Sequence, residues 1–394
     1  MEKSSILNRK LKMGMVGGGR DSFIGEVHRT AARMDGQIEF AAGALSSTPE
    51  KSKLSGQDLW LPDDRNYSTY QEMLEKELAR PAGERIDFVA IVTPNHLHFP
   101  ISRAFLEAGF HVVCDKPLAL NLKEALELKK IVEASGKVFA LTHNYTGYPM
   151  VKQARHMVQT DELGKINKIV VEYPQGWLVQ PLEQQGSRQA EWRTDPARSG
   201  PGGCLGDIGT HADNLVHYIT GLEIAEMCAE LTTFVPGRQL DDDVMMMLRY
   251  RGGAKGILHA SQISTGSENG FNIRIWGTKG ALQWFQENPN YLHVYRHREP
   301  RQIYSRAQDY EYLCEAVRRN SRIPWGHPEA FIEAFANIYR NVAVTIRAVE
   351  TGQQPDEFAP DFPTIDDGVR GMAFIETAVK SSMSAEKWVK FIVV

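Results

Sequence analysis

The first third of the sequence alternates short apolar segments with amphipathic ones, and this alternation restricts the fold more than any other feature. Apolar segments that end at Gly, Pro, Asp or Asn are predicted strands: 11–16, 38–45, 86–92, 111–114 and 138–141. Apolar residues recur at helical spacing between them, in 25–34, 69–79, 97–108 and 121–134. Strands joined by helical crossovers run parallel and are covered on both faces. We therefore predict an α/β domain with a doubly wound parallel sheet over residues 1–148.

The pattern changes after residue 148. Strand-like segments follow one another with turn residues between them and few helical patterns: 168–173, 226–234, 244–250, 255–263, 271–276, 281–285 and 291–295. Helical spacing returns at 328–350 and 366–382. Consecutive strands followed by helices predict an α+β domain over residues 149–394, with a large open mixed or antiparallel sheet.

Composition excludes several classes of protein. Lys and Arg number 45 against 49 Asp and Glu in 394 residues, so there is no basic excess for nucleic-acid binding. No apolar run approaches the ~20 residues that span a membrane, and the N-terminus lacks the apolar core of a signal peptide, which predicts a cytoplasmic protein. The four cysteines lack paired Cys or His spacing, so no metal site is expected.

A glycine cluster follows the first predicted strand. A Gly-rich turn between a strand and a helix lets the backbone approach a pyrophosphate, whose charge the first amides of the helix stabilise. Gly17, Gly19, Phe23, Ile24 and Gly25 are the expected contacts of the cofactor. The spacing exceeds GxGxxG by three residues, so the loop is expected to bulge around 20–22, and a plain tight turn remains an alternative. The position after the first strand favours a dinucleotide-binding, Rossmann-type domain.

The end of the second predicted strand bears on the choice of coenzyme. An NAD site usually has an acidic residue there, which contacts the ribose hydroxyls. This sequence has Ser46 and Ser47 instead, and their hydroxyls could donate to a 2′-phosphate. The cofactor is thus NAD or NADP, with a small preference for NADP, unless the two serines only cap the next helix.

Three motifs carry a resemblance to a known family. They are Thr93-Pro94-Asn95-His96-Leu97-His98, then Cys114-Asp115-Lys116-Pro117, and then Gly202-Gly203-Cys204-Leu205-Gly206-Asp207-Ile208-Gly209-Thr210-His211. In this order and spacing the sequence resembles the Gfo/Idh/MocA oxidoreductases, which include glucose–fructose oxidoreductase and inositol dehydrogenase. The resemblance extends from about residue 12 to the last helix.

Lys116, Asp207 and His211 are the predicted catalytic residues. Lys116 stands at the end of a predicted strand, where an ammonium can stabilise a developing alkoxide. Asp207 and His211 are four positions apart, so they share one face of a helix predicted over 206–220. By resemblance the histidine is the base and the aspartate assists it, which suits its pKa near neutrality. A solvated surface lysine and an ordinary Asp/His pair are the structural alternatives.

The resemblance also implies binding residues. For the cofactor these are Thr93, Pro94, Asn95, His98, Asp115, Lys116 and Asn144, with Asp115 in the place usually held by Glu. For the substrate they are Lys116, Tyr145, Trp192, Arg193, Asp207 and His211. Trp and Arg offer a stacking face for a sugar and a clamp for its hydroxyls, although Trp192 could simply anchor its loop.

The leading hypothesis is an NAD(P)-dependent dehydrogenase that oxidises a secondary hydroxyl of a sugar or cyclitol. The alternatives are a glycosidase that uses bound NAD for transient oxidation, and a non-catalytic dinucleotide sensor. Relatives in the family associate through the open face of the second sheet, which predicts a homodimer or homotetramer. Otherwise the terminal helices cover both faces within one subunit.

Overall fold

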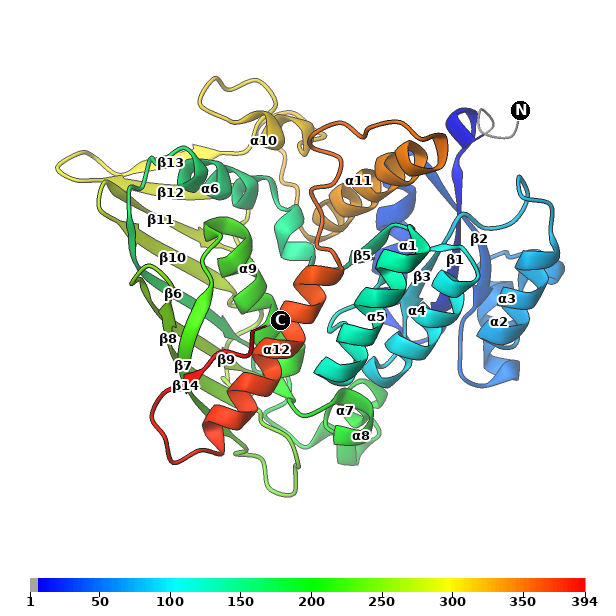
Figure 1. Ribbon diagram of the computed structural model, residues 1–394, viewed down its shortest axis with the longest axis horizontal. Coiled ribbons are helices and arrows are strands. Elements are labelled where there is room, and N and C mark those ends of the chain that lie inside the picture. The colour runs from blue at the N-terminus through cyan, green and yellow to red at the C-terminus, as the bar shows by residue number, and fades with distance from the viewer. Residues whose placement is uncertain (1–5, 394) are drawn as a thin grey trace. The chain divides into compact units, whose positions relative to one another are not determined.

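A five-stranded parallel sheet organises the first part of the chain in this computed structural model, which describes residues 6–393 (Figure 1). The strand order is β2-β1-β3-β4-β5, and every neighbouring pair is parallel. The bounds are β1 (Leu11–Gly17), β2 (Ile38–Ala44), β3 (Phe88–Val92), β4 (His111–Cys114) and β5 (Phe139–Leu141). The predicted doubly wound parallel sheet is confirmed.

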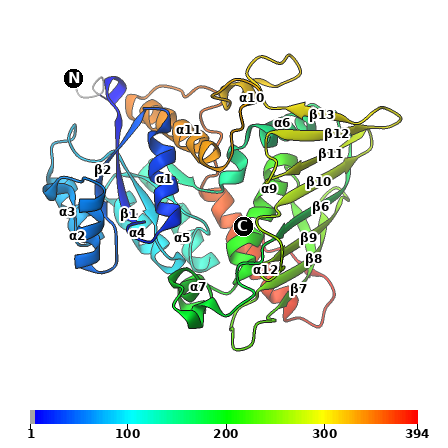
Figure 2. The same ribbon diagram turned by 180° about the vertical axis from the view of Figure 1, so that it is seen from behind.

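Helices cover both faces of this sheet. They are α1 (Phe23–Met34), α2 (Pro49–Asp58), α3 (Tyr70–Ala79), α4 (His98–Glu107), α5 (Leu122–Ser135) and α11 (Phe331–Thr351). Short 3-10 segments are η2 (Ile6–Asn8), η3 (Asp63–Arg65), η4 (Asn95–Leu97) and η5 (Asn144–Gly147). Figure 2 shows α1 and α11 on one face, with α4 and α5 on the other. The first and last of these elements thus share one core, in which Val27 packs with Ile338 and Val342.

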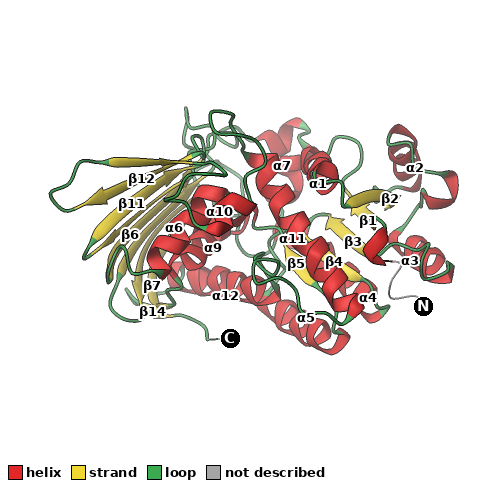
Figure 3. Cartoon of the chain, turned by 90° about the horizontal axis from the view of Figure 1, so that it is seen from above, coloured by secondary structure: helices red, strands yellow, loops and turns green. Residues whose placement is uncertain are grey.

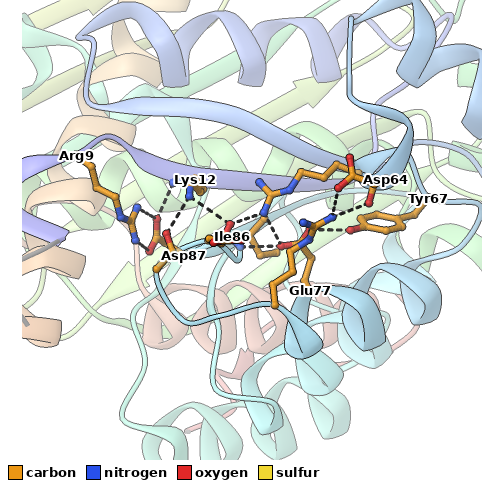
Figure 4. A network of polar contacts seen from close by, with 11 residues as sticks. Arg9, Lys12, Asp64, Tyr67, Glu77, Ile86 and Asp87 are labelled. Atoms are coloured by element: carbon orange, nitrogen blue, oxygen red, sulfur yellow. Dashed lines mark hydrogen bonds and ion pairs between the residues drawn. The ribbon is translucent and has the colours of Figure 1, made fainter. Parts of the chain in front are cut away.

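A network of polar contacts ties the amino ends of β1 and β3 to α3 (Figure 4). Asp87, just before β3, binds Arg9 through both carboxylate oxygens at 2.6 and 2.7 Å. Glu77 on α3 is fully buried and accepts from the hydroxyl of Tyr67 at 2.8 Å and from the backbone amide of Ile86 at 2.9 Å. These contacts satisfy buried charges at the edge of the sheet opposite to the carboxyl ends, where ligands of such folds bind.

The chain divides into two compact units, which are described separately below. Within the described residues the first unit comprises 6–119, 123–144 and 331–368, and the second comprises 120–122, 145–330 and 369–393. The division into domains 1–148 and 149–394 stays a prediction. The compact units differ from it mainly because α11 packs with α1, which brings residues 331–368 into the first unit.

A nine-stranded mixed sheet forms the second unit, in the order β13-β12-β11-β10-β6-β9-β8-β7-β14. Its strands are β6 (Ile166–Pro174), β7 (Ile224–Thr232), β8 (Asp243–Tyr250), β9 (Lys255–Ser261), β10 (Asn272–Gly277), β11 (Gly280–Phe285), β12 (Tyr291–Arg296), β13 (Gln302–Ser305) and β14 (Val389–Lys390). The central pair β6 and β9 is parallel, and the other pairs are antiparallel. The predicted open mixed sheet is confirmed.

Helices cover one face of this sheet, as Figure 3 shows for α6, α9 and α12. The helices of this part are α6 (Pro149–Gln159), α7 (Arg188–Arg193), α8 (Pro196–Ser199), α9 (Thr210–Thr220), α10 (Glu315–Arg319) and α12 (Ile365–Ser382), with a 3-10 segment η6 (Leu182–Gln185) and a π-helical segment η7 (Leu205–Gly209). Between residue 148 and the terminal pair, the structure has a helix near the predicted 206–220 and, in addition, α6 and the short α7, α8 and α10. The helix α6, which directly precedes the strand-rich segments, was not predicted from the sequence.

The second face of the sheet stays open within the subunit. On β8 the side chains of Val244 and Met246 are buried, whereas Met245 is 61% exposed and Met247 43% exposed. Ile257 on β9 and Trp276 on β10 are also exposed on this face. The alternative in which the terminal helices cover both faces is therefore wrong.

Candidate active site

The glycine loop joins β1 to α1 through close backbone contacts. The amide of Gly19 donates to the carbonyl of Leu45 at 3.1 Å, and a Cβ on Gly25 would clash with the backbone of Gly18. The helix begins at Phe23, two residues before the expected start, because the Ser22 hydroxyl caps it by accepting the amide of Gly25 at 3.2 Å. The extra residues form a turn in which Asp21 has a positive φ of 66°.

The loop and the adjacent strand end suit a dinucleotide. The first amides of a helix lack intrahelical partners, so the start of α1 offers donors to a pyrophosphate. At the carboxyl end of β3, the hydroxyl of Thr93 is buried and makes no hydrogen bond to the part of the chain that the structure describes. A cofactor that passes this strand end would give that hydroxyl a partner. Pro94 and Asn95 follow Thr93 at this edge, and Asn95 is 3% exposed.

Hydroxyl groups and two ion pairs lie near the end of β2. Ser46 lies within 3.5 Å of the Thr48 hydroxyl, and Thr48, not either serine, is the N-cap residue of α2. The guanidinium of Arg20 binds Asp58 through two hydrogen bonds, the longer at 2.9 Å. Lys51 binds Asp21 at 2.7 Å. Arg20 of the glycine loop and Lys51 of α2 are thus both paired with carboxylates, and the second lysine of α2, Lys53, donates to the carbonyl of Asn66.

Lys116 follows β4 in a turn that is held by its neighbours. The Asp115 carboxylate accepts from the Lys116 amide at 3.0 Å and from the Thr142 hydroxyl at 2.8 Å. The His98 ring is fully buried, with Nδ1 2.7 Å from the Pro117 carbonyl and Nε2 2.9 Å from the Thr93 carbonyl. Burial lowers the pKa of His98, and a neutral ring donates to one of these carbonyls. His98 therefore ties the turn of Lys116 to the end of β3.

Asp207 and His211 lie at the start of a long helix in the second unit. The helix does not begin as the α-helix predicted over 206–220, because Leu205–Gly209 is π-helical and α9 follows from Thr210. Residues four positions apart lie about one turn apart in either geometry, so the two side chains project from neighbouring turns. The His211 side chain is 7% exposed.

The carboxylate of Asp207 receives two side-chain donors. Gln262, directly after β9, donates its amide to Oδ2 at 2.8 Å, and the Arg193 guanidinium donates to the same oxygen at 3.2 Å. The guanidinium carbon of Arg193 lies 4.2 Å from the ring centre of Trp192 and 6.0 Å from that of Trp177. The predicted substrate residues Trp192, Arg193 and Asp207 are thus brought together, beside two indole faces.

Aromatic rings enclose His211. The Tyr145 ring meets the imidazole edge-on with ring centres 4.8 Å apart, and its hydroxyl is hydrogen-bonded to that of Tyr173. Tyr173 in turn stacks on Phe271 at 4.4 Å. Burial raises the pKa of Tyr145 to about 12 and also raises the pKa of Tyr173 well above its ordinary value, so both phenols stay neutral near pH 7.

Several residues of this arrangement were not predicted from the sequence. Gln262 and Asp241 reach the helix start from strand ends that are distant in the chain. The run 241–243 of three aspartates before β8 was a visible signal, but the sequence does not show which elements it faces. In the first unit, Asn144 is buried at η5, and the aromatic ring of Phe23 is exposed at the start of α1.

Among residues 6–393, no group of three or more His, Cys, Asp or Glu is placed to hold a metal ion. No helix within that range combines the length and apolar character needed to cross a bilayer.

Comparison with known proteins agrees with this architecture. Residues 11–143 match the family described as "Oxidoreductase family, NAD-binding Rossmann fold", and residues 151–283 match "GFO/IDH/MocA C-terminal domain". The chain is 34% identical to an uncharacterized oxidoreductase, YfiI, of Bacillus subtilis (strain 168), over 98% of both chains. It is 26% identical to the levoglucosan dehydrogenase of Pseudarthrobacter phenanthrenivorans, over 97% of this chain and 98% of that one.

Solved structures give the same result. An inositol dehydrogenase homolog from Azotobacter vinelandii, crystallised with NAD+, matches with a TM-score of 0.92 and 36% identity, over 97% of this chain and 98% of that chain. Its complex with NADH and myo-inositol matches with a TM-score of 0.88 and 34% identity over the same shares. The fold and the matched families define an oxidoreductase with an NAD-binding domain. The chain belongs to the GFO/IDH/MocA family, as its sequence motifs predicted.

Proposed function

We propose that this protein is a dehydrogenase that transfers a hydride between a secondary hydroxyl of a sugar or cyclitol and a nicotinamide coenzyme. The observation that carries the proposal is the surroundings of Asp207, where a carboxylate, a guanidinium and two indole rings meet beside a buried histidine. A carboxylate that accepts from hydroxyls, a guanidinium that donates to them and aromatic faces together can orient a polyol. The similarity to a myo-inositol complex supports the same substrate class.

The residues have distinct roles in this proposal. His211 accepts the proton of the substrate hydroxyl, and Asp207 fixes the orientation and charge of the ring. Lys116 donates a hydrogen bond to the substrate oxygen, which gains negative charge as the C–H bond breaks. The bound nicotinamide supplies the hydride acceptor. Tyr145 holds the His211 ring from its edge, and the backbone of Gly17, Gly19 and Gly25 orients the coenzyme.

A panel of polyols and sugars tests the reaction. Formation of NADH or NADPH is followed for the wild-type protein, Lys116→Ala and His211→Ala, with myo-inositol and levoglucosan included. Each variant should lose about 10²- to 10⁴-fold in kcat. Full activity in both variants would exclude the assigned roles. Release of a free sugar without net coenzyme reduction would favour the glycosidase, and bound coenzyme without any turnover would favour a sensor.

The coenzyme proposed for this reaction is NAD. The absence of an acidic residue after β2 favoured NADP slightly, but Arg20 and Lys51 are already paired with carboxylates, so neither is free to bind a 2′-phosphate. The matched family is described as NAD-binding. Comparison of kcat/KM for the two coenzymes tests this choice, and a preference for NADP would contradict it.

A second copy of the chain is the proposed partner of the open sheet face. Met245, Met247, Ile257 and Trp276 expose apolar area there, and burial of such a patch favours association. Light scattering at low micromolar concentration should give a dimer or tetramer, and Met245→Lys should shift the population toward the monomer. A monomeric wild-type protein would contradict this proposal.

A further inference from the structure

Three successive backbone amides at the start of the Asp207 helix converge on one residue. Gly203 donates to Asp241 Oδ1 at 2.7 Å, Leu205 donates to Oδ2 at 2.7 Å, and Cys204 donates to the Asp241 carbonyl at 2.8 Å. We propose that Asp241 is a positioning residue, which fixes the helix start and thereby sets where Asp207 and His211 point. The proposal rests on the proposed function, in which these two side chains handle the proton.

The backbone of Gly203 and the Asp241 carbonyl lie too close together for a side chain at residue 203. A Cβ on Gly203 would collide with the Asp241 carbonyl, so the second glycine of the diglycine allows this approach. The Asp241 side chain is 7% exposed, and its two oxygens are each occupied by an amide. A carboxylate at the first amides of a helix satisfies donors that would otherwise lack partners and interacts favourably with the helix dipole.

The same segment also places the partner of Asp207. The carbonyl of Asp242 accepts the backbone amide of Gln262 at 2.9 Å, and the Gln262 side chain donates to Asp207 at 2.8 Å. Residues 241–242 therefore hold both the helix that carries Asp207 and the donor that orients its carboxylate. A shift of this segment would move both parts together, and small displacements of reacting groups have large effects on rate.

Charge and burial fit a positioning role. Burial raises the pKa of Asp241 to about 6, although the amides of Leu205 and Gly203 oppose the shift. The charged and titratable groups around this segment are Asp207 with Arg193, Asp242 with Arg238, Asp243 with His259, and the Cys204 thiol. Among residues 6–393, no cation forms an ion pair with Asp241, so its charge is stabilised mainly by the backbone of the helix start.

The test compares Asp241→Asn with Glu329→Gln. Glu329 is also buried in the second unit, but its carboxylate accepts from the amides of Arg322 and Ile323 and from Arg306 rather than from the helix start. For each folded variant, kcat and KM are measured with the polyol that the wild type oxidises, NADH affinity is measured by fluorescence, and thermal unfolding is recorded. The His211 ring is followed by ¹⁵N NMR and is assigned by comparison with His211→Gln.

Asp241→Asn should lower kcat by about 10- to 100-fold, with KM and NADH affinity unchanged. The ¹⁵N chemical shifts of the His211 ring should change in this variant and stay in place in Glu329→Gln. If Asp241→Asn does not fold, Asp241→Glu keeps the charge, displaces the carboxylate and should lower kcat in the same way. Wild-type kcat in a folded Asp241 variant, or an equal loss in Glu329→Gln, would overturn the proposal. The NMR measurement needs no turnover, so it tests the positioning role even if no polyol is oxidised.

Discussion

Near neighbours in the chain hold much of the candidate coenzyme site, whereas distant residues hold the candidate proton-transfer site. In the first unit, Ser22 caps the amide of Gly25 three positions away, and Asp115 binds the amide of the adjacent Lys116. In the second unit, Asp207 is bound by Gln262, 55 positions away, and the Leu205 amide by Asp241, 36 positions away. Contacts between near neighbours need only the local turn, whereas the second arrangement needs segments of the mixed sheet that are far apart in the chain.

The largest expected effect concerns the pH dependence of stability. The pKa of Asp241 is raised from 3.8 to about 6, so the folded protein binds its proton more tightly than the unfolded chain. This contribution is complete below pH 3.8 and is lost as the pH rises through 6, which amounts to about 3 kcal/mol. Relative to Asp241→Asn, the wild-type free energy of unfolding should therefore fall by about 3 kcal/mol between about pH 4 and pH 7.

Glu350 of the first unit provides the opposite case. A hydrogen bond from His111 lowers its pKa to about 2, so its contribution is present above pH 4.5 and is lost as the pH falls through 2. The free energy of unfolding of Glu350→Gln should therefore lie below that of the wild type near neutral pH. This difference should become smaller as the pH falls toward 2. Denaturant titrations at several pH values measure both differences. If the free energies of unfolding of wild type and Asp241→Asn changed with pH in parallel, the opposite behaviour expected for Asp241 and Glu350 would be contradicted.

The next effect tests the local construction of the first unit. Gly25→Ala places a methyl group against the Gly18 backbone, so the glycine loop must shift. Overpacking of this kind costs about 1–3 kcal/mol, and NAD+ should bind about 10- to 100-fold more weakly. Isothermal titration calorimetry measures the affinity. Gly83→Ala is the control, because an added Cβ there meets no atom within 4 Å.

A smaller effect is expected where a distant donor supports Asp207. Gln262→Leu removes one hydrogen bond to a carboxylate, which should lower kcat about 10-fold and leave NAD+ affinity unchanged. Gln308→Leu, which removes hydrogen bonds to the carbonyls of Ser321 and Arg322 in the same unit, should keep wild-type kcat. Steady-state kinetics measure kcat for both variants. An equal loss of kcat in Gln262→Leu and Gln308→Leu would show that the hydrogen bond from Gln262 to Asp207 has no specific effect on the reaction.

The smallest effect concerns coenzyme choice. Asp58→Asn weakens the exposed pair with Arg20 and leaves a cation near the end of β2. The ratio of kcat/KM for NADP over NAD should rise by up to about 5-fold, as expected for an exposed charge. Fluorometric assays with each coenzyme give the ratio. A fall in the ratio would show that Arg20 does not approach the 2′ position.

The contrast between the two units also explains what the sequence could predict. The alternation of strands and helices, the cap of α1 by Ser22 and the hydrogen bond from the Lys116 amide to Asp115 depend on near neighbours, and the structure confirms the fold that the alternation implies. The π-helical start at Leu205–Gly209, the helix α6 and the anchor residue Asp241 depend on packing between segments far apart in the chain. No local pattern encodes such contacts, so the sequence predicted Asp207, His211, Arg193 and Tyr145 as site residues but not Gln262 or Asp241.

We have proposed that Lys116 and His211 act on the same hydroxyl in one chemical step. A double-mutant cycle tests it most directly, with kcat/KM measured for wild type, Lys116→Ala, His211→Ala and the double variant on one polyol. Residues that act as a unit are strongly non-additive, so the double variant should lose little more activity than the worse single variant. Losses that multiply in the double variant would mean that the two residues act independently, and they would contradict this account.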